Sequence, residues 1–393
     1  MPLSHPAGGA QADFGEADVW LQGKLTRVAY FVMSLPFSDA FFCQVFPREC
    51  TETFQAGHCR AFEFFGGVPR RISYDNSRIA VAKFVGRRGD TPTQEFLRLE
   101  SHFLFEHHFC LVRRANEKGH VEGLVGFARR NFMVPVPVFD TFAALNVHLA
   151  DCCRKRLGEV LRGETETISA RLQRDLAAFR HPLPQPYDAC EKLGTRVSSL
   201  SLVRYRLNDY SVPTSFGHRE VLVRGYVHEV VIACGTEIIA RHPRSYERED
   251  FVFDPLHYLA LIEQKINALD QAAPLADWKL PEEFATVRRL LEARMGKPGK
   301  REFVQVLRLM ETFTPDDVAA AVREAIQRGA IGFDAVKHLV LCRIERRPPR
   351  LDMAVYPYLP KAVVATTSAR SYMDLLSARG PASDVERDAA VAA

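Results

Sequence analysis

Three acidic residues, Asp13, Asp75 and Glu122, lie far apart in the sequence and are of a type that supports metal-dependent chemistry. Carboxylates from separate segments suit two-metal phosphoryl transfer, because Mg²⁺ is a hard ion that prefers carboxylate oxygens and keeps several waters. Two such ions, about 3.5–4 Å apart, can activate a water or a 3′-hydroxyl and stabilise the leaving oxygen. This chemistry needs no nucleophilic side chain. The sequence has no GxSxG, HExxH or Walker A motif that would favour a serine hydrolase, a zinc protease or a P-loop ATPase.

Each acid also has an ordinary structural explanation when it is taken alone. Asp13 could be a turn residue, with Glu16 and Asp18 beside it as competing acids. Asp75, in the segment RISYDNSRIA, could start an Asx-turn. Glu122 could be a surface residue of a helix. The case for a site therefore depends on whether the fold brings the three together.

The order of predicted elements places all three acids in one α/β domain. The pattern predicts three strands, including a hairpin over residues 26–34 and 39–46, and then a helix with Thr51 as its N-cap and Gly66-Gly67 as its stop. The segment RRISYDN predicts a strand, residues 92–104 a helix, FEHHFCLV a strand and residues 118–131 a helix.

This succession is typical of a mixed sheet with flanking helices, in which chemistry tends to lie at strand ends, where Asp75 falls. On the last helix, Glu122 and Arg129 share a face beside the inward apolar stripe, so we expect Glu122 at the edge of the core.

Composition sets wider limits. The chain has 393 residues, of which 47% are hydrophobic and 25% charged, and this is typical of a soluble protein with two or three domains. Nine cysteines without a CxxC pair favour a reducing compartment. The absence of an apolar run near 18 residues and of a secretory signal predicts a cytoplasmic protein with no membrane association. The net charge of +4 alone is weak evidence for a nucleic-acid partner.

The rest of the chain divides by composition. After a catalytic core over 1–140, residues 141–190 read as a helical connector with a proline-rich linker, and 191–254 as a small antiparallel β-barrel. Residues 255–348 read as a helical region suited to protein contacts, and 349–393 as an irregular, disordered tail.

Two arginines of the predicted barrel, Arg204 and Arg206, are two residues apart and so are expected on one strand face, with Tyr205 on the other. Such a face could contact phosphates or could simply keep the outer surface soluble.

Several short motifs resemble one known family. QADFGEA, GGVPRRISYDN and NEKGHVEGLVGFARRNFMVP resemble the catalytic domain of IstA-like insertion-sequence transposases, members of the retroviral-integrase, RNase H-like DDE superfamily. HPRSYEREDFVFDPLHYLALIEQK is similar to the C-terminal half of that family. The resemblance spans about residues 10 to 290, and it implies an RNase H-like mixed five-stranded sheet.

The resemblance also implies roles for residues. Asp13, Asp75 and Glu122 match the catalytic and metal-binding triad, with 46 residues between the last two, and Mg²⁺ is the expected cofactor, with Mn²⁺ as an alternative. Asn76 is expected to position Asp75 rather than to bind metal, because a neutral amide adds no charge to offset two divalent ions. The candidate DNA contacts are Lys118, Arg129, Arg130, Arg204 and Arg206.

Members of this family cut DNA at the element ends and join the 3′-hydroxyls to a target. The resemblance therefore implies three partners: element-end and target DNA, an IstB-like AAA+ helper ATPase, and further copies of the chain assembled on DNA. Family members carry helix-turn-helix modules before the catalytic domain, whereas about a dozen residues precede Asp13 here. The sequence therefore predicts an amino-terminally truncated transposase. A catalytically idle remnant that only binds DNA or protein is the competing hypothesis.

Overall fold

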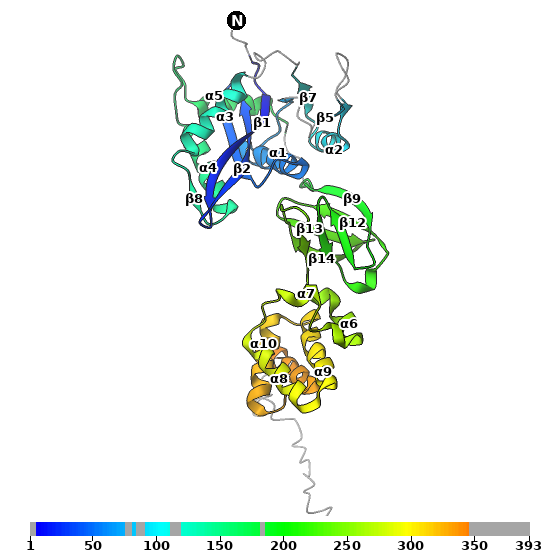
Figure 1. The fold of residues 1–393 in the computed structure, drawn as a ribbon. Coiled ribbons are helices and arrows are strands. Elements are labelled where there is room, and N and C mark those ends of the chain that lie inside the picture. The colour runs from blue at the N-terminus through cyan, green and yellow to red at the C-terminus, as the bar shows by residue number, and fades with distance from the viewer. Residues whose placement is uncertain (1–4, 75–80, 84–90, 111–118, 181–184, 346–393) are drawn as a thin grey trace, which may run out of the picture.

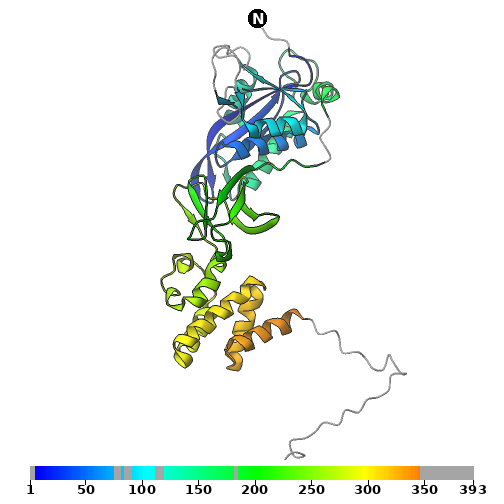
Figure 2. The same cartoon turned by 90° about the vertical axis from the view of Figure 1, so that its right-hand side faces the viewer.

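The computed structural model describes residues 5–74, 81–83, 91–110, 119–180 and 185–345. A sheet domain, a domain of two small sheets and a helical domain follow one another in chain order (Figures 1 and 2). Within these residues, no helix is both long and apolar enough to cross a membrane.

The sheet domain is built on a mixed sheet whose strands lie in the order β3-β2-β1-β4-β7. These strands are β1 (Gly9–Leu21), β2 (Lys24–Leu35), β3 (Ala40–Phe46), β4 (Arg71–Tyr74) and β7 (Glu106–Phe109). β1, β2 and β3 are antiparallel, whereas β1, β4 and β7 are parallel. The predicted mixed sheet is confirmed, but it has six strands rather than five, because a short strand, β8 (Val138–Phe139), pairs with the end of β1. A separate small pair is formed by β5 (Val81–Lys83) and β6 (Thr91–Pro92).

Helices cover both faces of this sheet. They are α1 (Thr51–Phe65), α2 (Gln94–Phe103), α3 (Gly119–Phe132), α4 (Phe142–Arg156) and α5 (Ile168–Ala178). One hydrophobic cluster joins the sheet to α1, α2 and α5 through residues such as Phe62, Leu99 and Leu172. A second cluster joins the other face to α3 and α4 through residues such as Leu124 and Leu145. The segment expected to be a helical connector is therefore packed onto the sheet.

The signals that begin and end α1 are local. The N-cap is Cys50 rather than the expected Thr51, and Thr53 Oγ1 accepts a hydrogen bond from the Cys50 N–H at 2.9 Å. The helix stops at Gly66, as predicted, because that residue adopts a left-handed conformation with φ of 73°.

Residues 191–254 fold into two small sheets around one core. The sheets have the orders β14-β13-β12-β9 and β10-β11-β15. Their strands are β9 (Glu191–Arg196), β10 (Leu202–Tyr205), β11 (Asn208–Ser211), β12 (Glu220–Gly225), β13 (Glu229–Cys234), β14 (Glu237–Pro243) and β15 (Phe251–Val252). Val203, Tyr210, Val223 and Ile232 from both sheets share the core. The expected small antiparallel β-barrel is not confirmed, because the strands of this fully described segment form two separate sheets, and β11 and β15 pair in parallel.

The helical domain has its own core, which includes Leu259, Phe284, Phe303 and Val322. Its helices are α6 (Leu256–Gln264), α7 (Ala273–Ala276), α8 (Glu282–Met295), α9 (Lys297–Arg308), α10 (Pro315–Arg328) and α11 (Phe333–Ile344). α10 begins as predicted, because Thr314 Oγ1 accepts a hydrogen bond from the N–H of Asp317 at 3.2 Å.

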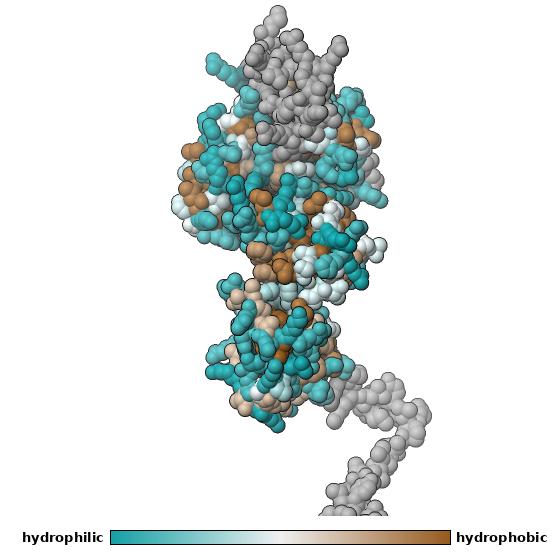
Figure 3. All heavy atoms as spheres, turned by 45° about the vertical axis from the view of Figure 1, so that its right-hand side comes forward, coloured by the Kyte–Doolittle hydropathy of each residue, from teal (hydrophilic) through white to brown (hydrophobic). Residues whose placement is uncertain are grey.

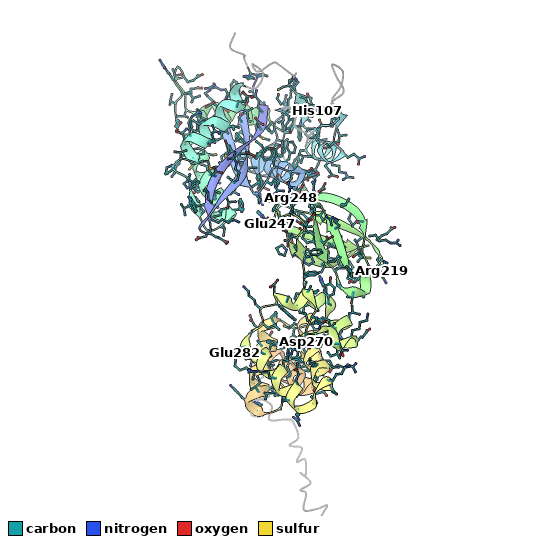
Figure 4. All side chains as sticks on the ribbon, in the orientation of Figure 1. His107, Arg219, Glu247, Arg248, Asp270 and Glu282 are labelled. Carbon is teal, nitrogen blue, oxygen red and sulfur yellow. The ribbon has the colours of Figure 1, made fainter. Side chains whose placement is uncertain are left out.

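The helical domain meets the two small sheets at an apolar junction. A cavity of about 290 Å³ lies there, lined by Leu200, Phe251, Phe253 and Leu261 among others. In Figure 3, hydrophobic side chains coloured brown lie where the molecule narrows toward the helical domain. Within the helical domain, by contrast, charged pairs tie helices together: Asp270, labelled in Figure 4, pairs with Arg288 and Lys300, and these two cations lower its pKa.

Candidate active site

Asp13 lies within β1, on the sheet face that α3 covers. Side chains alternate along a strand, so Gln11, Asp13 and Gly15 share that face. Asp13 is partly buried, and its Oδ1 accepts a hydrogen bond from the N–H of Phe14 at 2.9 Å. It is therefore a strand residue rather than the residue of a turn.

The two competing acids lie on the opposite face of β1. Glu16 and Asp18 are both exposed, and Arg27 pairs with them at 2.7 Å and 3.5 Å. Because strand alternation separates them from Asp13, these acids are not part of the same site.

The parallel register of β1 and β4 brings the first two acidic segments together. It runs from Gly9 opposite Arg71 to Ala12 opposite Tyr74. In the sequence, Asp13 follows Ala12 and Asp75 follows Tyr74. Asp75 lies outside the described residues, as do Asn76 and Lys118.

The end of β4 is fixed by a buried hydrogen-bond chain from α1. His58 Nε2 and the Tyr74 hydroxyl are 2.8 Å apart, and His58 Nδ1 lies 2.7 Å from the Phe54 carbonyl oxygen. Burial lowers the pKa of His58 to about 4, so the neutral ring donates to Phe54 and accepts from Tyr74. Tyr74, the residue before Asp75, is thereby held in one position.

α3 lies close against β1 at the level of Asp13. The N–H of Val121 donates to Gln11 Oε1 at 3.1 Å, and the Tyr30 hydroxyl donates to the Val125 carbonyl at 3.0 Å. A Cβ on Gly15 would lie 2.4 Å from Tyr30 Cζ and 2.8 Å from Val125 Cγ1. The helical turn from Val121 to Val125 therefore follows the stretch from Gln11 to Gly15, with Asp13 at its middle.

One side of α3 is held toward β2 and β3. His120 Nε2 donates to Asp39 Oδ1 at 2.8 Å, and its Nδ1 lies 3.3 Å from Ser34 Oγ. Further along the helix, the rings of Phe127 and Phe41 meet at a centroid distance of 6.0 Å. These contacts fix the rotation of α3 about its axis.

That rotation directs Glu122 toward the side of β1 on which β4 lies. Successive residues of a helix are about 100° apart, so Glu122 and Arg129 share the side opposite His120 and Phe127. β1 lies between β2 and β4 in the sheet. Glu122 is exposed, so the expectation that it lies at the edge of the core is wrong.

The charge of Asp13 affects the pKa values of two neighbouring side chains, Tyr30 and Glu49. Burial, followed by Cys43 and then by Asp13, raises the pKa of Tyr30 to about 12, while Arg129 acts in the opposite direction. Burial, Asp13 and Glu16 also raise the pKa of Glu49. The charge of Asp13 therefore acts on both neighbours. Among the described residues, no group of three or more His, Cys, Asp or Glu side chains could hold a metal ion, and Asp75 is outside that set.

The candidate DNA contacts are spread over two domains. Arg129 and Arg130 are exposed on the last turns of α3. Arg204 lies on β10 and pairs with Asp209 at 3.1 Å. Arg206 lies beyond the end of β10 in a turn with φ of 57°, so the expected strand face shared with Arg204 is wrong. The alternation of residues 204–206 predicted that the strand continues through Arg206. Instead, β10 ends at Tyr205, because a two-residue connection to β11 follows it.

A buried charge cluster that the sequence did not reveal joins the sheet domain to the two small sheets. Glu52, in the first turn of α1, has a side chain that is 0% exposed and pairs with Arg244. Arg206 also reaches this cluster, at 3.5 Å from Glu52 and 2.8 Å from Glu191. An acid in the first turn of a helix is common, so its sequence context gives no signal of a partner almost two hundred residues away.

Comparisons with known proteins place this chain among transposases. The family described as "Mu transposase, C-terminal domain" matches residues 183–254. A transposase of Aminobacter aminovorans is 30% identical over 384 residues, which cover 95% of this chain and 73% of that protein. The transposase for insertion sequences IS1326/IS1353 of Pseudomonas aeruginosa is 31% identical over 356 residues, covering 89% and 69%. The transposase for IS21 of the same organism is 30% identical over 261 residues, covering 65% of each chain.

Among solved structures, the chain is similar to the catalytic core domain of the HTLV-2 integrase in complex with magnesium. The match has 18% identity and a TM-score of 0.31, and it covers 42% of this chain and 97% of that one. On the strength of the sequence relatives, the predicted family is confirmed, and the chain belongs to the IS21-like family of DDE insertion-sequence transposases.

Proposed function

We propose that Asp13, Asp75 and Glu122 are the carboxylates with which this transposase holds divalent ions and cuts and joins DNA strands. The observation that carries the proposal is the position of Asp13. Asp13 directly follows Ala12, the last residue of β1 that pairs with β4. The turn of α3 that bears Glu122 packs against the stretch of β1 that contains Asp13. Carboxylate oxygens fit Mg²⁺, and Mn²⁺ accepts the same ligands. When bound there, such ions would supply an activated 3′-hydroxyl or water and stabilise the leaving oxygen.

The chain itself contributes position and charge. The Gln11, Tyr30 and Gly15 contacts hold α3 against β1, so Asp13 and Glu122 keep a fixed relation before any ion binds. Arg129 lies on the same side of the helix as Glu122, where it offers a cation to a DNA phosphate near the carboxylates. Arg130 and Lys118 are proposed to contact the DNA backbone beside it.

Further partners remain part of this proposal. DNA at the element ends and at the target is the substrate, and further copies of the chain are expected to assemble on it. The helical domain is the proposed contact surface for the helper ATPase. A cytoplasmic location stays a prediction.

Strand transfer with pre-cut element-end DNA tests the proposal. Asp13→Asn, Asp75→Asn and Glu122→Gln should each abolish joining and leave the thermal unfolding curve nearly unchanged, because each change removes the charge of a proposed ion ligand and keeps the size of the side chain. Asp18→Asn is the matched control, since it alters an acid of the same strand on the opposite face. Full activity in any of the three variants would remove that residue from the site. A wild-type chain that binds this DNA but never joins it would favour the idle binding protein.

The role of Asn76 needs a separate measurement. As a residue that positions Asp75, Asn76→Ala should slow joining and leave the Mg²⁺ concentration dependence nearly unchanged. Full recovery at raised Mg²⁺ would instead make Asn76 a contributor to metal affinity.

A further inference from the structure

A cavity of about 430 Å³ opens on the sheet face that carries Asp13, near the beginning of the parallel strands. Gln11, Ser73 and His108 line it, and they are direct register partners across β1, β4 and β7. They therefore form one row across the sheet. Asp13 begins the next row on the same face, roughly 7 Å further along β1 at about 3.3 Å per residue. The cavity is thus next to the proposed catalytic carboxylates.

The two adjacent histidines of β7, His107 and His108, lie on opposite faces of the sheet. His107, labelled in Figure 4, turns toward α2 and pairs with Glu100 at 2.6 Å. His108, the next residue, lines the cavity. His5 lines it as well, and its ring lies 6.4 Å from that of His120 on α3. Imidazole rings of this kind offer flat surfaces against which a base can stack.

Positive charge gathers at the mouth of the cavity. Arg70 and Arg71 line it, are exposed, and form no ion pair with any residue in the described part of the chain. Gly9, the register partner of Arg71 on β1, also lines the cavity. The neighbouring acid Asp175 is buried, and its Oδ1 accepts a hydrogen bond from the N–H of Gly8 at 2.8 Å.

We propose that this cavity binds one unpaired nucleotide of the substrate DNA beside the bond that is cut or joined. The phosphate would lie at Arg70 and Arg71, and the base would lie beside Ser73, His5 and His108. The volume is in the range of a small-molecule site, about 300–1,000 Å³, so a single nucleotide enters and a duplex does not. Only the location next to the reacting bond rests on the proposed role of Asp13; the nucleotide site itself does not.

DNA binding without metal tests the site independently of catalysis. The probes are a short labelled duplex with an unpaired 3′ overhang and the same duplex with a blunt end, both in buffer with EDTA. The wild-type chain should prefer the overhang about fivefold or more, the lower range expected for one stacked base. The Arg70→Ala/Arg71→Ala variant should lose this preference, and its salt slope on the overhang probe should fall by about 0.7 for each phosphate that the variant no longer neutralises.

Two further variants make the test specific. Arg60→Ala/Arg98→Ala removes the same charge from α1 and α2, on the other face of the sheet, and should keep the preference. Ser73→Leu narrows the cavity without a change of charge and should weaken overhang binding while blunt-end binding is kept. If Ser73→Leu fails to fold, the two arginine variants decide.

The outcomes are distinct. Equal wild-type affinity for both probes, or an equal loss on both probes in the Arg70→Ala/Arg71→Ala variant, would overturn the nucleotide site. Asp13→Asn should keep the overhang preference even though it abolishes joining. An Asp13→Asn variant that joins DNA normally would instead overturn the proposed catalytic role and leave the nucleotide site standing.

Discussion

Glu52 provides the clearest test of how the sheet domain is fixed to the two small sheets. Its side chain is fully buried, and so, at 5% exposure, is that of its partner Arg244. The Tyr205 hydroxyl donates to Glu52 Oε1 at 3.2 Å, and Arg206 reaches its second oxygen at 3.5 Å. The carboxylate thus neutralises a guanidinium that has very little contact with water.

The Glu52→Gln variant keeps the shape of the side chain and removes its charge. Burial by itself would lower the pKa of Arg244, but Glu52, followed by Tyr246 and Tyr205, raises it overall. Without Glu52, a buried cation remains without its counter-ion, and breaking a buried pair in this way costs about 3–5 kcal/mol.

Arg60 and Glu63 provide the matched control on the same helix. They pair at 2.7 Å, but their side chains are 61% and 62% exposed. An exposed pair contributes about 0.2–1 kcal/mol, so Glu63→Gln should be nearly neutral. Glu52→Gln and Glu63→Gln make the same chemical change, and they differ in whether the ion pair that is broken is buried or exposed.

Urea unfolding of the full chain, followed by fluorescence and by hydrogen exchange at the junction, measures the difference. Glu52→Gln should expose amides of α1 and β14 before the rest of the sheet domain unfolds. The Glu52→Gln/Arg244→Met double variant should be more stable than the single variant, because no buried charge is left unpaired. A Glu52→Gln chain within about 1 kcal/mol of wild type would refute the reasoning.

Three further predictions concern packing, protonation and DNA binding. Gly15→Ala should displace α3, destabilise the chain by about 1–3 kcal/mol and slow strand transfer, whereas Gly123→Ala, whose Cβ meets nothing within 4 Å, should leave strand transfer unchanged. The pKa values of His58 and His257 are lowered to about 4, so the unfolded chain binds more protons than the folded chain between about pH 4 and 6.5. Stability should therefore fall as the pH falls through that window, by up to about 3 kcal/mol for each histidine. Urea titrations at several pH values should show that His58→Gln flattens this dependence. If Arg204 contacts a phosphate, Arg204→Ala should lower the salt slope of duplex binding by about 0.9, and an unchanged slope would leave it a solubilising residue.

Local signals account for the part of the fold that the sequence predicted. Gly66 ends α1 and Thr314 caps α10 because each acts on the backbone within a few residues of itself. The alternation along β1 and β2 indicates strands because the period of a strand is two. Helix ends and strand alternation can be predicted from a short window of sequence because they depend on residues that are close together in the chain.

Contacts between distant segments could not be predicted in the same way. Tyr205 and Glu52 are 153 residues apart, and neither belongs to a motif that would indicate the other. Arg206 was expected to extend a strand, but its left-handed backbone depends on the tight connection between β10 and β11. The two small sheets likewise depend on which strands pair, and alternation alone does not decide that.

The residues that position the site are different from those that do its chemistry. Gln11 and Tyr30 hold α3 through hydrogen bonds to its backbone, and His58 holds Tyr74 at the end of β4. None of these contacts uses Asp13 or Glu122. Loss of charge at those two acids should therefore remove activity and keep the fold. Replacement of a positioning residue such as Gln11 should instead weaken stability and activity together, because the N-terminal turn of α3 would lose its attachment to β1.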